Sequence, residues 1–144
     1  MDSVVRPNSK IENQTFLTKE SVLVIDDCRE SLELQEILLG YEGYEVHTAE
    51  SGNDAIELLS IIAKPSLILL DMNLGDMSGI ELMNKLEETH PEIILQVPVV
   101  FLTGMNEVPE SKAVGFIRKP AETDAFLADI KRFITLGQQA ITPS

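Results

Sequence analysis

Short apolar runs that end abruptly in polar residues constrain the fold of this chain more than any other feature. Leu67–Leu70 is apolar throughout, which is typical of a parallel strand buried on both faces. In an open parallel sheet, ligands bind beyond the carboxyl ends of the strands, so the polar residues there predict one shared site. The four runs and the residues after them are Ser21–Ile25 before Asp26 and Asp27, Leu67–Leu70 before Asp71, Val97–Leu102 before Thr103, and Gly115–Arg118 before Lys119 and Pro120.

Strand patterns and helical patterns alternate along the chain. The alternation predicts an α/β fold: a doubly wound, five-stranded parallel sheet with helices on both faces. The predicted strands are Val22–Ile25, Tyr44–Thr48, Ser66–Leu70, Val97–Leu102 and Phe116–Arg118. The predicted helices cover about Arg29–Leu39, Asn53–Ile62, a segment starting near Gly79, and Glu122–Leu136.

Helical spacing also predicts which side chains of each helix face the sheet. In the first helix, the apolar row is Leu34, Ile37, Leu38 and Tyr41. In the later helices, the rows are Ala55, Leu58, Leu59 and Ile62, then Ile80, Met83 and Leu86, then Phe126, Ile130, Phe133 and Ile134.

Composition limits the class of protein. With 144 residues and 44% hydrophobic residues, the chain is long and apolar enough for one packed domain. We expect this domain at residues 21–137. Residues 1–20 are expected to form a flexible tail, and residues 138–144 a C-terminal tail or the start of a linker. A formal net charge of -13 disfavours direct nucleic-acid binding. The single cysteine, Cys28, allows no intramolecular disulfide. No apolar stretch reaches about 18 residues and no signal peptide is present, so we expect a cytoplasmic protein without membrane insertion.

The polar residues at the strand ends suit phosphoryl transfer assisted by a metal ion. Asp26 and Asp27 repel each other and need a cation such as Mg²⁺, although a helix N-cap would explain one of them. Asp71 beside that cation can attack a phosphoryl group and form an acyl phosphate. Lys119 supplies a positive charge and Thr103 a hydroxyl for the phosphate oxygens.

In this set and order of residues, the chain resembles the receiver domain of two-component response regulators from about Ser21 to Leu136. The resemblance implies a flavodoxin-like sheet with strand order 2-1-3-4-5. It also implies that Asp71 is the phosphoacceptor and that Mg²⁺ is the cofactor. The implied metal site consists of Asp26 through water, Asp27 and Asp71 directly, and the backbone carbonyl of Asn73. Thr103 and Lys119 are the residues implied to contact the phosphoryl group. The implied conformational switch pairs Thr103 with Phe116. The alternative for Phe116 is that it is an ordinary aromatic residue of the core.

The function implied by this resemblance is a phosphorylation-controlled signalling module of a phosphorelay, and not an enzyme with its own substrate. The phosphoryl group would come from a phosphohistidine on a sensor histidine kinase or a histidine phosphotransfer protein. Its arrival on Asp71 would change the binding of an unidentified downstream protein.

The sequence departs from the family pattern in two places. The segment from Gly104 to Val114 is short, so we expect the fourth helix of the family to be short or missing, which puts the usual output surface in doubt. Gly75 stands where the family usually has proline, and we expect it to make the loop after Asp71 more mobile.

Three other functions remain as alternatives. The short segment after Thr103 keeps open a receiver-like interaction module that does not depend on phosphorylation. An aspartate-nucleophile phosphatase would use an acid two residues after the nucleophile, where this chain has Asn73. A flavin-binding electron carrier would need a phosphate-binding loop after the first strand, where Asp26 and Asp27 would repel a phosphate.

Overall fold

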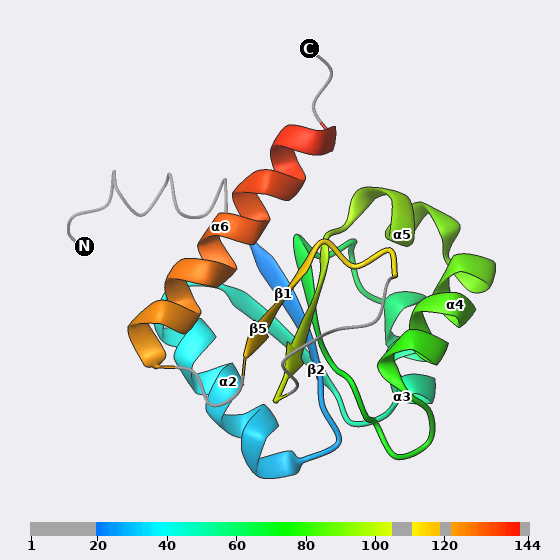
Figure 1. Cartoon of the computed structure of the whole chain (residues 1–144), viewed down its shortest axis with the longest axis horizontal. Helices are drawn as coiled ribbons and strands as arrows, with labels where there is room; N and C mark the ends of the chain where they lie inside the picture. The colour runs from blue at the N-terminus through cyan, green and yellow to red at the C-terminus, as the bar shows by residue number, and fades with distance from the viewer. Residues whose placement is uncertain (1–19, 105–110, 119–121, 142–144) are drawn as a thin grey trace, which may run out of the picture.

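A five-stranded parallel sheet forms the centre of the protein in a computed structural model, which describes residues 20–104, 111–118 and 122–141 (Figure 1). The strand order is β2-β1-β3-β4-β5 and every neighbouring pair is parallel. The doubly wound α/β fold and the 2-1-3-4-5 order are therefore confirmed. The strands are β1 (Ser21–Ile25), β2 (Glu45–Ala49), β3 (Leu67–Asp71), β4 (Val99–Thr103) and β5 (Gly115–Arg118).

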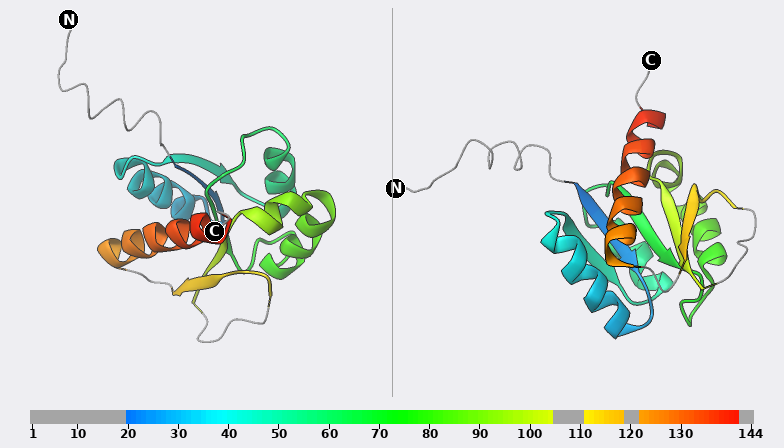
Figure 2. Two further views of the ribbon diagram at one scale, coloured as in Figure 1. Left: turned by 90° about the horizontal axis from the view of Figure 1, so that it is seen from above. Right: turned by 60° about the vertical axis from the view of Figure 1, so that its left-hand side comes forward.

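Helices cover both faces of the sheet (Figure 2). On one face lie α2 (Arg29–Tyr41) and α6 (Thr123–Ile141), and on the other lie α3 (Gly52–Leu59), α4 (Gly79–Thr89) and α5 (Pro91–Gln96). Because side chains alternate along a strand, Val22 and Val24 pack towards α2 and α6, whereas Leu23 and Ile25 pack towards the other layer. Central strands buried on both faces have to be apolar throughout, which is why they were visible in the sequence.

The face of α2 that packs on the sheet differs from the prediction. Leu34, Ile37 and Tyr41 are exposed, Leu38 is only partly buried, and the buried row is Leu32, Gln35 and Leu39. The prediction was wrong because the more apolar of the two rows on this helix is the exposed one. The row that is buried carries a glutamine, and this side chain has a polar partner near the sheet.

The apolar row of the last helix is confirmed, since Phe126, Ile130, Phe133 and Ile134 are all buried. In the other two rows, Ala55, Leu59, Met83 and Leu86 are buried, while Leu58, Ile62 and Ile80 are partly buried against the core. Helix α6 continues to Ile141, beyond the predicted end at Leu136.

Two connections differ in their helix content. Helix α5 was not predicted, and it begins with Pro91, a residue suited to the first helical position. Between β4 and β5, the described residues Gly104 and 111–114 are not helical, as a short or missing fourth helix requires. The rest of that connection, 105–110, lies outside the described residues.

Candidate functional site

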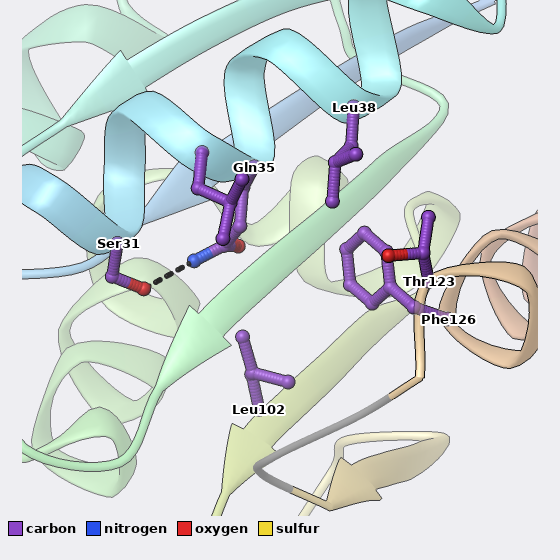
Figure 3. A pocket seen from close by; sticks show the side chains of 7 residues that line it. Ser31, Gln35, Leu38, Leu102, Thr123 and Phe126 are labelled. Atoms are coloured by element: carbon purple, nitrogen blue, oxygen red, sulfur yellow. Dashed lines mark hydrogen bonds between the residues drawn. The ribbon is translucent and has the colours of Figure 1, made fainter.

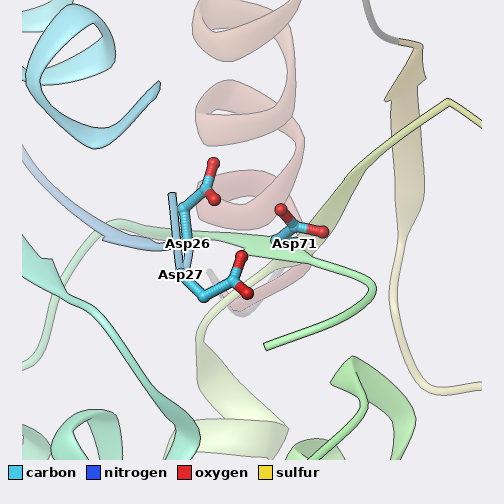
Figure 4. Close-up of side chains that lie close together, drawn as sticks. All are labelled: Asp26, Asp27 and Asp71. Carbon is cyan, nitrogen blue, oxygen red and sulfur yellow. The ribbon is translucent and has the colours of Figure 1, made fainter. Parts of the chain in front are cut away.

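Three aspartates meet at the carboxyl edge of the sheet (Figure 4). The register places Ile25 beside Leu70, so Asp26 follows β1 at the level where Asp71 ends β3. The backbone N–H of Asp26 donates to the carbonyl of Ala49 over 3.1 Å, which fixes the chain at this point against β2. Adjacent parallel strands thus bring together residues that are far apart in the sequence.

The carboxylates of Asp26, Asp27 and Asp71 are close enough to share a cation. One oxygen from each lies within 4.8 Å of the others, with Asp26 buried, Asp71 half-buried and Asp27 exposed. Three negative charges at this spacing repel one another unless a cation lies between them. Carboxylate oxygens are the hard ligands that Mg²⁺ prefers, and the exposed side leaves access for water and phosphate oxygens. The donor set therefore fits Mg²⁺.

Asp26 is held by a hydrogen-bond network that sequence reasoning missed. The Cys28 backbone N–H donates to Asp26 Oδ1 over 3.0 Å, and Ser31 Oγ and Gln35 Nε2 donate to Oδ2 over 2.8 and 3.1 Å. The side chain is only 1% exposed, so these donors replace the water that a buried carboxylate loses. The sequence signal that could have revealed this network is Gln35. It lies three residues after Leu32 and four before Leu39, so it belongs to the row of α2 that packs on the sheet.

The loop after Asp71 is folded back on itself by hydrogen bonds. The Asn73 N–H donates to Asp71 Oδ1 over 3.1 Å, and the Asn73 side chain accepts from the Gly75 N–H over 3.2 Å. Gly75 has φ of 83°, which glycine adopts without strain, and Leu74 beside it is buried. Whether Gly75 increases the mobility of this loop stays a prediction.

Helix α4 starts directly against the backbone of Asp71. A capping box opens the helix: the Ser78 side chain accepts from the Glu81 N–H, and the Glu81 side chain accepts from the Ser78 N–H. A Cβ on Gly79 would lie 2.9 Å from the Asp71 carbonyl oxygen and 2.8 Å from the Phe101 ring. Only glycine permits this approach, which fixes the backbone of Asp71 from the side of α4.

A second carboxylate in the loop, Asp76, ties it to another helix. Asp76 accepts hydrogen bonds from the N–H groups of Gly52 and Asn53 at the start of α3, over 3.0 and 3.1 Å. These are two of the donors that a helix start leaves without an intrahelical partner. The little burial that Asp76 has raises its pKa, but the N–H groups of Gly52, Asn53, Asp76 and Met77 outweigh this, and the pKa lies below its ordinary value of 3.8. Asp76 thus fixes the loop after Asp71 on α3.

Asp76→Ala is expected to lower the free energy of unfolding by about 1 kcal/mol, the usual cost of losing a side chain that caps a helix start. Because the folded pKa is lowered, the contribution of Asp76 is fully present above its unfolded pKa and is lost as the pH falls through the folded pKa. Urea unfolding should therefore show a difference from wild type at pH 7 that shrinks below about pH 4. Asp54→Ala, in the same first turn, is the control; an equal loss in both variants would contradict this role of Asp76.

Of the remaining predicted site residues, Thr103 lies at the carboxyl edge of the sheet, Phe116 is exposed on β5, and Lys119 lies outside the described residues. Thr103 is buried at the end of β4, one residue beyond Leu102, which pairs with Asp71, so it lies at the same edge of the sheet. Phe116 of β5 pairs with Phe101 and is 40% exposed, so the alternative of an ordinary core aromatic is wrong, and its role as a switch stays a prediction.

Comparisons with known proteins agree with this fold and identify its family. A sequence profile of the response regulator receiver domain matches residues 22–131. The chain is 28% identical over 140 residues to the transcriptional regulatory protein CrdR of Helicobacter pylori, covering 93% of this chain and 61% of the relative. It is 31% identical over 115 residues to the cell cycle transcriptional regulator CtrA of Caulobacter vibrioides, covering 76% of this chain and 48% of the relative. The chain thus spans only part of these relatives.

Solved structures show the same fold. The CheY-like receiver domain protein of Methanospirillum hungatei superimposes with a TM-score of 0.74 at 25% identity, covering 85% of this chain and 99% of that one. The chemotaxis response regulator CheY4 of Vibrio cholerae gives 0.72 at 24% identity, covering 81% and 99%. The profile match over residues 22–131, on a 2-1-3-4-5 sheet with an acidic cluster at its carboxyl edge, establishes that the chain belongs to the response regulator receiver domain family, the signalling modules of two-component systems.

Proposed function

We propose that Asp71 accepts a phosphoryl group and that Asp26, Asp27 and Asp71, with the backbone carbonyl of Asn73, hold the Mg²⁺ that the transfer requires. The observation that carries this proposal is the approach of three carboxylates within 4.8 Å at the edge of the sheet where β1 and β3 end. Asp71 is the half-buried member of the cluster and ends the central strand. Its backbone is fixed by Gly79 and one of its carboxylate oxygens by the Asn73 N–H.

The proposed step is a transfer from a phosphohistidine to the Asp71 carboxylate. An Asp71 oxygen forms a bond to phosphorus while the bond from phosphorus to the imidazole nitrogen breaks. The donor imidazole is already protonated on its other nitrogen, so it keeps that electron pair and leaves as the neutral ring. The products are an aspartyl phosphate and histidine.

Residues around Asp71 would meet the charge on the phosphoryl group. The bound metal would neutralise part of the charge on the phosphoryl oxygens. The Thr103 hydroxyl, buried at the end of β4, would donate to one phosphoryl oxygen, and Lys119 would contact another. Asp26, whose carboxylate is held by three donors, would orient the metal through water, as the family resemblance implies.

The partners we propose are a sensor histidine kinase or a histidine phosphotransfer protein as donor, and a downstream protein that reads the phosphorylated state, in the cytoplasm. Helix α2 follows Asp26 and Asp27 in the sequence and carries exposed apolar side chains. These side chains, which are suited to contact with a protein, are Leu34, Ile37 and Tyr41. Within the described parts of the chain, no helix is long and apolar enough to cross a membrane.

Removal of the metal tests this function. The wild-type protein, incubated with acetyl phosphate and Mg²⁺, is expected to gain the mass of one phosphoryl group, and an excess of EDTA over Mg²⁺ should prevent the gain. Mass spectrometry of the intact protein measures both, and the loss of the label on brief treatment at high pH distinguishes an acyl phosphate from a serine ester.

Failure of labelling would favour the alternative, an interaction module that does not depend on phosphorylation. The observation behind that alternative is the non-helical backbone described at Gly104 and 111–114, beside an exposed Phe116. A folded protein that gains no mass from acetyl phosphate, nor from a phosphorylated histidine kinase, would contradict the proposal.

A further inference from the structure

The Asp26 carboxylate is clamped by two side chains from consecutive turns of α2. Ser31 Oγ and Gln35 Nε2 both donate to the same oxygen, Oδ2, over 2.8 and 3.1 Å. Gln35 Nε2 also donates to Ser31 Oγ over 2.8 Å, the bond drawn in Figure 3, so the three side chains form a closed triangle. Two donors on one oxygen, both carried by a rigid helix, fix the position of Oδ2, and the Cys28 N–H fixes the other oxygen, Oδ1.

Gln35 does not serve packing at its position. Its side chain is 5% exposed, and its Oε1 atom is buried without a hydrogen-bond partner among the described residues. It lies beside a largely apolar cavity of about 200 Å³. The side chains that line the cavity are Ser31, Leu34, Gln35, Leu38, Leu102, Thr123 and Phe126. An apolar residue would pack here without leaving a polar atom buried and unsatisfied. What glutamine provides here, and an apolar residue cannot, is the pair of hydrogen bonds to Asp26 and Ser31.

We propose that Ser31 and Gln35 are positioning residues for the metal site: they hold the Asp26 carboxylate in the orientation in which it orders the Mg²⁺ beside Asp27 and Asp71. This inference rests on the proposed function, because it concerns the same metal. Hydrogen bonds to the carboxylates around a metal commonly change affinity by 10–100-fold when they are removed. Without the clamp, Oδ2 of Asp26 loses both side-chain donors while the Cys28 N–H still holds Oδ1, so the carboxylate is less firmly oriented and part of the binding free energy of the metal is used to order it.

Gln35→Met and Ser31→Ala test the clamp. Methionine keeps the length of glutamine and suits the apolar surroundings, but it cannot donate to Asp26. We expect the dissociation constant of Mg²⁺ to rise about tenfold in Gln35→Met and to rise also in Ser31→Ala. Because both donors act on one oxygen, the double variant should lose less than the product of the two single effects. Titration with Mg²⁺, followed by the amide signals of residues 26, 27 and 71 in NMR spectra, gives the constants.

A readout of folding separates positioning from structure. Gln35→Met is expected to unfold thermally within a few degrees of wild type when Mg²⁺ is absent, because the buried Oε1 atom is removed together with the bond. Gln96→Met, the same substitution on the exposed surface of α5, should leave Mg²⁺ binding unchanged. If Gln35→Met does not fold, Ser31→Ala decides alone, since it removes only one hydroxyl.

Two negative outcomes are distinguishable. Wild-type affinity for Mg²⁺ in both Gln35→Met and Ser31→Ala would overturn the clamp and leave the proposed function intact. A wild-type protein that binds no Mg²⁺ would overturn both.

Discussion

Asp71→Asn is expected to abolish phosphorylation and to leave the fold intact. The amide oxygen is a much weaker nucleophile than a carboxylate, and the substitution removes one of the three charges that attract the metal. The backbone contacts at this position, to Gly79 of α4 and within the sheet, do not involve the carboxylate. With acetyl phosphate and Mg²⁺, mass spectrometry of the intact variant should show no phosphoryl adduct where wild type shows one.

Asp54→Asn on α3 is a matched control, because it removes one exposed carboxylate away from the cluster. It should be labelled at the wild-type rate. An Asp71→Asn protein that unfolds at the wild-type temperature but still gains the phosphoryl mass would show that another residue is the acceptor. The thermal unfolding temperature of Asp71→Asn is therefore measured first. If it is close to that of wild type, a missing adduct shows loss of the phosphoacceptor and not loss of the fold.

Asp27→Asn is expected to have opposite effects on stability and on phosphorylation. Each pair of charges in the cluster repels by about 1–3 kcal/mol at this separation, for effective dielectric constants between those of water and a protein surface. Asp27 is exposed and screened, so removing its charge should raise the free energy of unfolding by about 1 kcal/mol when Mg²⁺ is absent. The rate of labelling by acetyl phosphate should fall by a factor on the order of 100.

Urea unfolding with and without Mg²⁺ measures the first effect. Wild type should gain stability from Mg²⁺, because the ion binds the folded state, and Asp27→Asn should gain little. Glu36→Gln on the exposed side of α2 is the control for a general loss of negative charge from a chain of net charge -13. A loss of stability in Asp27→Asn without Mg²⁺ would contradict the view that the carboxylates are held together against their repulsion.

The sheet could be predicted because burial on both faces leaves a simple mark in the sequence. Val22–Ile25 and Leu67–Leu70 have to be apolar at every position, and their lengths suit strands. The packing face of α2 could not be predicted, because Gln35 interrupts its apolar row and Leu34, Ile37 and Tyr41 offer a more regular one on the exposed side. Periodicity identifies an amphipathic helix, but it selects the wrong face when the buried row carries a polar residue with a function.

The acidic cluster could be predicted for a different reason. Asp26, Asp27 and Asp71 follow buried strands directly, and topology alone brings them to one edge of the sheet. The residues that hold the cluster in place are a matter of tertiary structure. Asp76 reaches the start of α3 across 24 positions of sequence, and an exposed aspartate in a loop gives no sign of that contact. The donors from α2 to Asp26 are hidden in the same way.

The measurement that tests the central claim most directly is the location of the phosphoryl group. Wild-type protein is labelled by a phosphohistidine donor or by acetyl phosphate with Mg²⁺, and borohydride then reduces the acyl phosphate to an alcohol. Peptide mass mapping should find Asp71, and no other aspartate, converted to homoserine. Conversion of Asp27, of Asp26 or of an acid outside the cluster, with Asp71 unchanged, would contradict the assignment of Asp71 as the phosphoacceptor.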